Sequence, residues 1–223
     1  MHTSDLSKHL AANSCTAWKP TVQVPSNHYN SDYYGWHRWV NYYWQLKTAL
    51  ETNQQSLLEI GIGGSILADA LRRFGISVVT ADIDPELNPD VVSSVTALPF
   101  GNAKFDTVVC CEVLEHMPYP HALYALKELR RVARQNVLIS VPHVGPTFAI
   151  SLAVHLLPVR EFRIRFPHPK KLRTGGEHFW ECGRPGFPLR RFRKDLLKAG
   201  FGLISEKRPP TSCWHAVFWL SVE

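Results

Sequence analysis

Apolar and polar residues follow two different periods along this chain, and these periods predict strands and helices in turn. Leu57 to Ile60 is a short apolar run followed by glycines, which is typical of a buried parallel strand. From Ile66 to Phe74 the apolar residues recur at helical spacing, and the apolar run from Ile76 to Ala81 predicts the next strand. Further strands are predicted at 91–95, 105–113, 136–141, 201–207 and 215–222, and further helices at 36–50, 118–133 and 192–200. This repeated order of strand and helix indicates an α/β protein with a largely parallel sheet.

The turn after the first predicted strand contains Gly61 and Gly63. Glycines in such a turn allow backbone angles and a close ligand approach that a Cβ atom would prevent, so nucleotide-like cofactors commonly lie over it. Asp82 ends the second strand, roughly 20 residues further on, where a carboxylate can bind ribose hydroxyls. A pyrophosphate-binding turn would need another glycine near Ile66, so a dinucleotide suits this turn less well than a mononucleoside ligand.

Four segments resemble, in order and spacing, those of the class I S-adenosylmethionine-dependent methyltransferases. They are Glu59–Gly63, Ala81–Pro85, Ala97–Phe100 and Phe105–His116. The resemblance covers about residues 55 to 142. It implies a Rossmann-like, doubly wound sheet of seven strands in the order 3-2-1-4-5-7-6, with the last strand antiparallel. It also implies S-adenosyl-L-methionine as the cofactor.

The resemblance assigns each cofactor contact to a part of the ligand. The expected contacts are Glu59, Gly61 and Gly63 at the methionine end, Asp82 at the ribose, Thr96, Ala97 and Leu98 at the adenine edge, and Glu112 near the sulfur. Ile83, next to Asp82, is also expected to contact the cofactor. One position departs from the family pattern. Ser94 stands where many members have an acidic residue that contacts the adenine amino group, so the adenine contact is expected from backbone groups and Leu98.

Composition changes divide the chain into an arm and one domain. Residues 1–35 are polar and contain two prolines, so we expect a flexible N-terminal arm before a methyltransferase domain at 36–223. Residues 143–187 interrupt the regular pattern before the last helix, and a long segment of this kind in a compact domain is usually a lid or a binding loop. The methyl acceptor is therefore expected to be selected by this insertion.

The insertion contains a short segment rich in groups that can move a proton. His178 titrates near neutrality, and Glu177 or Glu181 could orient its ring. We therefore name His178 and Glu177 as candidate catalytic residues, with a purely structural role for His178 as an equal alternative. His178 and Cys182 alone provide too few ligands for a metal at this spacing, so no metal site is predicted. A histidine at His116 is frequent in the resembling family across different chemistries, so a structural or cofactor-side role is favoured for it.

Charge and cysteine content bear on the possible binding partners and on the cellular compartment of the protein. The net charge of +6 arises largely from arginines and lysines in the last third of the chain, which could face nucleic acid, an anionic substrate, an acidic membrane surface or simply solvent. The five cysteines show no paired spacing, which argues against a disulfide framework. With no apolar run of roughly 20 residues and no signal-peptide core, a cytoplasmic protein is expected.

These observations favour methyl transfer to a small or lipid-like metabolite, at an oxygen or a carbon. An RNA methyltransferase is the first alternative, supported by the basic residues, but Cys110 to Val113 lacks the Asn-Pro-Pro-aromatic or Asp-Pro-Pro-aromatic motif of enzymes that methylate the amino groups of bases. A non-catalytic protein that keeps the cofactor fold as a scaffold is the second alternative.

Overall fold

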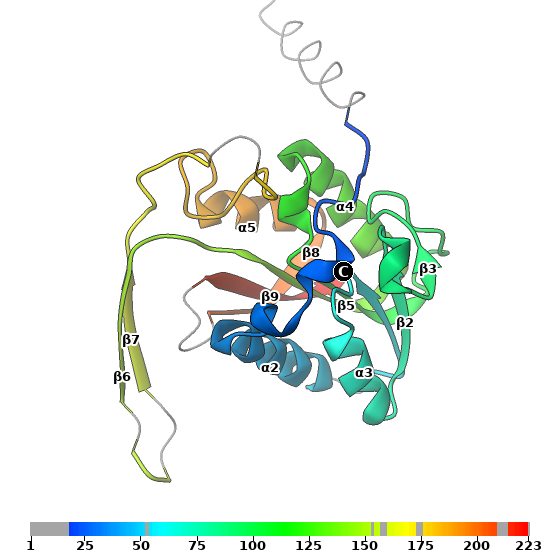
Figure 1. Cartoon of the computed structure of the whole chain (residues 1–223), viewed down its shortest axis with the longest axis horizontal. Helices are drawn as coiled ribbons and strands as arrows, with labels where there is room; N and C mark the ends of the chain where they lie inside the picture. Colours follow the sequence, from blue (N-terminus) through cyan, green and yellow to red (C-terminus); the bar gives the residue numbers. More distant parts are fainter. Residues whose placement is uncertain are drawn as a thin grey trace, which may run out of the picture.

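The computed structural model describes residues 18–51, 54–152, 154–156, 160–172, 176–208 and 214–222 (Figure 1). Its centre is a seven-stranded sheet in the order β3-β2-β1-β4-β5-β9-β8. The strands are β1 (Ser56–Ile60), β2 (Ser77–Asp82), β3 (Val91–Val92), β4 (Phe105–Cys111), β5 (Ala133–Pro142), β8 (Phe201–Lys207) and β9 (His215–Val222). The first five strands are parallel, and β9 runs antiparallel to both β5 and β8. The predicted strand order and the antiparallel last strand are confirmed.

Helices cover both faces of the sheet, as in a doubly wound fold (Figure 1). The principal helices are α2 (Trp36–Leu50), α3 (Ile66–Arg73), α4 (Tyr119–Val132) and α5 (Leu189–Lys198). Alternate residues of each strand point to opposite faces, so Leu58 and Ile139 pack in the core beneath α4 and α5, whereas Leu57 and Leu138 pack beneath α2 and α3. The predicted helix at 36–50 matches α2 residue for residue.

The chain follows an irregular path between β2 and β3. The short 3-10 helix η3 (Pro85–Leu87) occupies the place where a regular helix would stand. Pro85 and Pro89 lack backbone N–H donors, which disfavours a regular helix through this stretch. β3 contains only two residues, shorter than the predicted strand at 91–95, and the next three residues, 93–95, line a pocket instead.

Residues 18–35 belong to the predicted N-terminal arm and lie over the carboxyl ends of the strands. They contain two 3-10 helices, η1 (Ser26–His28) and η2 (Ser31–Tyr33), which are blue in Figure 1. Residues 1–17 lie outside the described residues, so the flexibility expected for the arm stays a prediction. The described part nevertheless contributes aromatic side chains to the functional site below.

The insertion contains a hairpin that projects from the body of the molecule (Figure 1). Its strands are β6 (Thr147–Leu152) and β7 (Arg160–Arg165), which pair antiparallel. The apolar side chains of β6 are largely exposed, whereas the later part of the insertion returns to the sheet, where His143 and Cys182 form a β-bridge. Within the described part of the chain, every helix is too short or too polar to cross a bilayer.

Candidate functional site

The glycine turn after β1 has a geometry that only glycine satisfies without strain. Gly61 has a φ of +77°, and a Cβ atom on it would lie 2.2 Å from Cγ2 of Val113. Gly63 has a φ of +49°, and a Cβ atom there would lie 2.9 Å from the ring of Tyr29. The backbone N–H of Gly61 donates to the carbonyl of Ala81 at 2.9 Å, which ties the turn to the end of β2. The turn therefore stays open to a ligand because it lacks side chains.

Asp82 ends β2 and holds the turn in place. Its Oδ2 accepts a hydrogen bond from the backbone N–H of Ile62 at 2.9 Å, and its Oδ1 accepts one from the N–H of Asp84 at 2.9 Å. Burial raises the pKa of Asp82, although the backbone donors oppose that effect. Its side chain lines a pocket together with Gly61 and Ile83, so the expected ribose contact lies at a ligand-accessible wall.

This pocket, called the cofactor pocket below, lies at the carboxyl ends of β1, β2 and β4. Its other lining residues include Trp18, Tyr29, Ser93, Ser94, Val95, Glu112, Val113 and His116. The predicted adenine-edge residues Thr96, Ala97 and Leu98 are not among the described lining residues. Leu98 is buried, and its backbone N–H donates to Glu128 Oε2 at 3.1 Å. Ser94 therefore lies at the pocket wall, and its Oγ is 2.9 Å from Oγ1 of Thr96.

Glu59 lies on β1 behind the glycine turn. Its side chain is 5% exposed, and burial raises its pKa to about 8. It borders a smaller pocket together with Gly61, Gly63 and Glu112. Because burial penalises the charged form, a cationic group brought next to Glu59 would favour its ionisation. The contact expected between Glu59 and the methionine end of the cofactor stays a prediction.

Glu112 stands at the centre of the site. It borders the cofactor pocket, the smaller pocket beside Glu59, and a third pocket on the opposite side. Its Oε1 accepts a hydrogen bond from the hydroxyl of Ser140 at 2.6 Å, and its Oε2 lies 3.1 Å from Nε2 of His215. Burial acts to raise the pKa of Glu112, but His215 and Ser140 hold it below its ordinary value. Glu112 therefore supplies a negative charge beside the cofactor pocket.

The third pocket, called the acceptor pocket below, adjoins the cofactor pocket. The two share Val24, Tyr29, Glu112 and His116. Its remaining wall includes aromatic and basic side chains, among them Tyr33, Arg38 and Trp214, together with the acidic residues Glu115, Glu177 and Glu181. A molecule bound here would meet a molecule in the cofactor pocket at Glu112 and His116.

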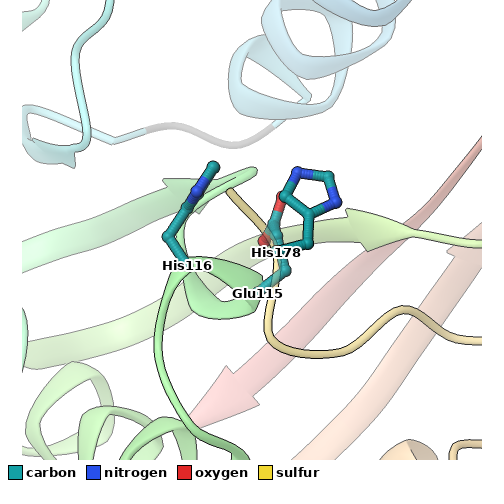
Figure 2. Close-up of side chains that lie close together, drawn as sticks. All are labelled: Glu115, His116 and His178. Atoms are coloured by element: carbon teal, nitrogen blue, oxygen red, sulfur yellow. The ribbon is translucent and has the colours of Figure 1, made fainter. Parts of the chain in front are cut away.

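Two residues of the 3-10 helix η4 (Leu114–His116) meet His178 from the insertion in the acceptor pocket (Figure 2). A carboxylate oxygen of Glu115 and one imidazole nitrogen each of His116 and His178 all lie within 4.8 Å of one another. The two imidazole rings are 4.9 Å apart between centroids. Burial, together with the nearby His178, lowers the pKa of His116, so the neutral form of that ring is favoured.

This cluster is absent from the sequence-based prediction. Glu115 and His116 lie in a motif common to the resembling family, and His178 lies in the insertion, so no local spacing connects them. A carboxylate and a histidine directly after a strand end were the only available signal. Cys182, considered with His178 as a metal ligand, is instead buried in the core.

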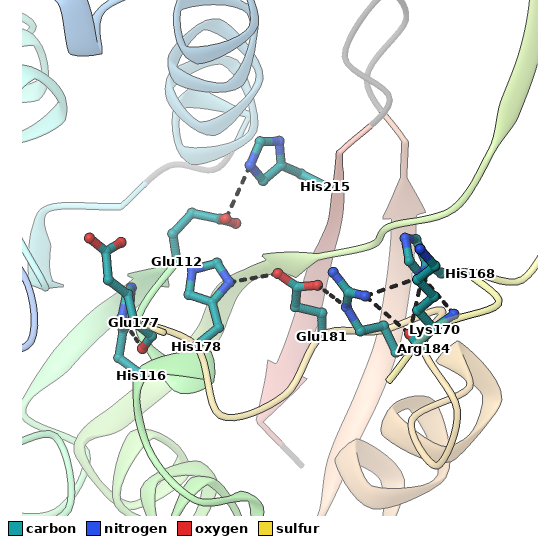
Figure 3. A network of polar contacts seen from close by, with 9 residues as sticks. All are labelled: Glu112, His116, His168, Lys170, Glu177, His178, Glu181, Arg184 and His215. Carbon is teal, nitrogen blue, oxygen red and sulfur yellow. Dashed lines mark hydrogen bonds and ion pairs between the residues drawn. The ribbon is translucent and has the colours of Figure 1, made fainter. Parts of the chain in front are cut away.

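His178 belongs to a polar network (Figure 3). Its Nδ1 lies 2.9 Å from Oε1 of Glu181, and Glu181 also forms an ion pair with Arg184. Arg184 contacts His168 Nδ1 and the carbonyl of Lys170, each at 3.1 Å. Glu181 rather than Glu177 therefore orients the His178 ring. Glu177 contributes its backbone carbonyl, which lies 3.1 Å from Nδ1 of His116.

Comparison with known proteins identifies the part of the chain that carries the motifs. Residues 58–141 match the family described as "Methyltransferase domain". A "Ubiquinone biosynthesis O-methyltransferase" of Xanthomonas euvesicatoria is 33% identical over 123 residues, 48% of this chain and 52% of that protein. A mitochondrial protein of the same name from Schizosaccharomyces pombe is 28% identical over 124 residues, 47% of this chain and 45% of that protein. The chain thus spans about half the length of these curated relatives.

Solved structures share the fold over most of the chain. The 1,6-didemethyltoxoflavin-N1-methyltransferase of Burkholderia thailandensis, bound to S-adenosylhomocysteine, has a TM-score of 0.55 and 16% identity, and the match covers 87% of this chain and 84% of that one. Magnesium protoporphyrin IX methyltransferase of Synechocystis PCC 6803, also bound to S-adenosylhomocysteine, has a TM-score of 0.54 and 17% identity, with 84% and 83% covered. The resemblance to class I methyltransferases is confirmed.

Proposed function

Because residues 58–141 match the methyltransferase domain family, we propose that the protein transfers the methyl group of S-adenosylmethionine to a hydroxyl oxygen of a small or lipid-like molecule. The observation that carries this proposal is the junction of two pockets at Glu112 and His116. One pocket has the glycine turn and Asp82 expected for an adenosyl group. The other has room for a second substrate beside it, as methyl transfer between two bound molecules requires.

The residues around the cofactor pocket suit a positively charged donor. Glu112 supplies a negative charge where the sulfonium is expected, and Glu59 lies behind the turn at the expected methionine end. When the donor is bound, its sulfonium carries its own leaving group, so the protein must mainly align the acceptor oxygen with the methyl carbon and exclude water. Tyr29 and Trp18 cover the cofactor pocket from the N-terminal segment and support that exclusion.

Two observations favour an oxygen acceptor on an aromatic or partly apolar molecule. The curated relatives bear the name O-methyltransferase, and the acceptor pocket is lined by Tyr33 and Trp214, which suit contacts with a ring or an apolar chain. Most of the basic residues noted in the sequence are divided between the β6–β7 hairpin and α5. Among them Arg184, Arg191 and Arg193 form ion pairs with carboxylates of the chain, so this distribution offers little support for an RNA acceptor.

Calorimetry and a methyl-transfer assay test this function. Titration with S-adenosylmethionine and with S-adenosylhomocysteine should give saturable binding and a raised melting temperature, whereas NADH should give neither. Incubation with donor carrying a labelled methyl group and a set of hydroxylated aromatic molecules should label an acceptor at oxygen. Binding of NADH in place of the methyl donor would contradict the cofactor assignment, and donor binding without any labelled acceptor in a cell extract would favour a scaffold.

A further inference from the structure

A pocket beside the insertion, called the basic pocket below, differs in charge from the acceptor pocket. It lies between the end of β7, the beginning of α5 and the residue that follows β8. Its volume is about 460 Å³, and none of the described residues that line it is acidic. The basic residues at its wall are Arg165, Arg184, Arg193, Arg208, His143 and His168. The acceptor pocket has four glutamates in its lining, so the basic pocket is the one that suits an anionic group.

Two arginines of the basic pocket share a single carboxylate. Nη2 of Arg193 donates to Oε1 of Glu206 at 2.8 Å, and Nη2 of Arg208 lies 3.2 Å from the same oxygen. One negative charge therefore offsets only half of the positive charge of this pair. Burial lowers the pKa of His143 to about 3, and Arg165 and Arg208 act in the same direction. The electrostatic potential at the pocket wall is therefore positive, which favours an anion.

His143 brings a buried nitrogen without a partner to the basic pocket. Its side chain is 7% exposed, and its Nδ1 has no hydrogen-bond partner among the described residues. The backbone around it is fixed, because its N–H donates to the carbonyl of Trp214 at 2.7 Å and its carbonyl accepts a hydrogen bond from Arg165. Buried polar atoms are normally hydrogen-bonded, so Nδ1 is free to donate to a ligand in this pocket.

The helix α5 begins at the basic pocket. Pro188, the residue before the helix, and Leu189, its first residue, both line the pocket. The helix has neither a side-chain cap at its N-terminus nor an acidic residue in its first turn. Because backbone N–H groups and the positive end of the helix dipole lie at an N-terminus, this end of α5 adds to the attraction for an anion.

We propose that the basic pocket binds a phosphoryl dianion, either free phosphate or the phosphoryl group of a small molecule. A phosphoryl group accepts several hydrogen bonds at once, and the planar guanidinium of arginine matches its geometry. Arg193 and Arg208 would contact its oxygens, with His143 as a neutral donor and the N-terminus of α5 at the remaining side.

The size and place of the basic pocket bear on the source of this group. Its volume of about 460 Å³ is far larger than the roughly 30 Å³ that one water occupies in the liquid, so part of a carrier molecule fits beside the phosphoryl group. Val144 lines both the basic pocket and the acceptor pocket, so the two adjoin. The proposed anion site does not depend on the proposed methyl transfer.

Calorimetric titration of the full-length chain with glycerol 3-phosphate and with inorganic phosphate tests the site. The buffer is held at about pH 8, where both probes are dianions, and at constant ionic strength with NaCl. Wild type should bind at least one probe saturably at a single site and melt at a higher temperature with it. Tighter binding of glycerol 3-phosphate would assign the site to a phosphorylated molecule, whereas equal or tighter binding of phosphate would assign it to the free ion.

Arg193→Gln and Arg208→Gln should each weaken binding of the probes about tenfold or more, because each removes a positive charge and its donors. Arg190→Gln is the matched control. It removes the same charge from α5, but Arg190 is exposed and is not among the described lining residues, so this variant should bind as wild type does.

His143→Leu tests the buried donor and should weaken binding about tenfold, since it removes a hydrogen bond to a charged group. If this variant fails to fold, Arg208→Gln keeps the test valid, because the side chain of Arg208 is 38% exposed and lies outside the core. Absence of saturable binding of either probe to wild type would overturn the proposal. Equal losses in Arg208→Gln and Arg190→Gln would also overturn it, because general positive charge would then explain the binding.

Discussion

Oε2 of Glu112 and Nε2 of His215 lie 3.1 Å apart, which joins the residue after β4 to the first residue of β9 across the intervening strand β5. Glu112 has a φ of +57°, a conformation that is uncommon for a residue with a Cβ atom. The contacts with His215 and Ser140 hold its carboxylate between the cofactor pocket and the acceptor pocket.

Glu112→Gln should weaken binding of S-adenosylmethionine more than binding of S-adenosylhomocysteine. The substitution keeps the shape of the side chain but removes the negative charge, and only the methyl donor carries the positive sulfonium. We expect about a tenfold loss for the donor, on the order of 1.4 kcal/mol, and a smaller loss for the product. Calorimetric titration of both ligands measures the difference. Ser140→Ala, which keeps the charge, is the control, and an equal loss for donor and product would show that Glu112 acts through shape alone.

Gly61→Ala should destabilise the protein by roughly 1–3 kcal/mol. The new Cβ atom would lie 2.2 Å from Cγ2 of Val113, at a φ of +77° that disfavours alanine. Urea unfolding measures the change in the free energy of unfolding. Gly101→Ala is a suitable control because a Cβ atom there has no neighbour within 4 Å, and its effect should stay within about 0.5 kcal/mol. Equal midpoints for the two variants would contradict the steric account.

The buried His143 should make the protein less stable in acid. Burial, together with Arg165, lowers its pKa to about 3. The unfolded chain binds a proton at His143 near pH 6.5, whereas the folded chain does not, so stability falls as the pH drops through the interval between these values. Between pH 7 and pH 5 this residue should account for a loss of about 2 kcal/mol.

Urea unfolding of His143→Gln at pH 7 and pH 5 measures that contribution. The variant should lose less stability on acidification than wild type, whatever its absolute stability. His155→Gln, at an exposed position of the hairpin, should retain the wild-type pH dependence. A pH dependence unchanged by His143→Gln would rule out this residue as the cause.

Trp180→Phe should loosen the insertion from η4. Phenylalanine keeps most of the buried ring but lacks the Nε1–H that donates to Leu114 and Met117, so two buried carbonyls lose a partner. The expected cost is about 1–3 kcal/mol. Hydrogen exchange at the Phe179 amide, which donates to Glu115, reports on the contact locally. Unchanged protection at that amide would mean that other contacts position His178.

The cofactor side of the site was largely predictable from the chain because its residues follow local rules. Asp82 is the last residue of an apolar strand, and Gly61 and Glu112 each directly follow one; parallel strands bring their carboxyl ends to one edge of the sheet. The expected adenine edge was less predictable. Ser94 rather than Leu98 reaches the pocket wall, because β3 ends early and Leu98 turns into the core.

The acceptor side depends on contacts between segments far apart in the chain. His178 reaches Glu115 and His116 because Trp180 and Phe179 bond to η4, and no periodicity near His178 predicts that partner. The sequence likewise does not specify that Glu181, and not Glu177, contacts the ring of His178, because this depends on where the two side chains point in the folded chain.

Apolar periodicity by itself determined the order of strands and helices in this protein, since each element must bury one face or stripe against the sheet. The motifs after β1, β2 and β4 determined the edge at which a ligand would bind. Only the tertiary structure decided which polar groups share the acceptor pocket. Side chains separated by roughly 60 residues meet there because buried hydrogen-bonding groups must find partners across the fold, and local sequence does not specify those partners.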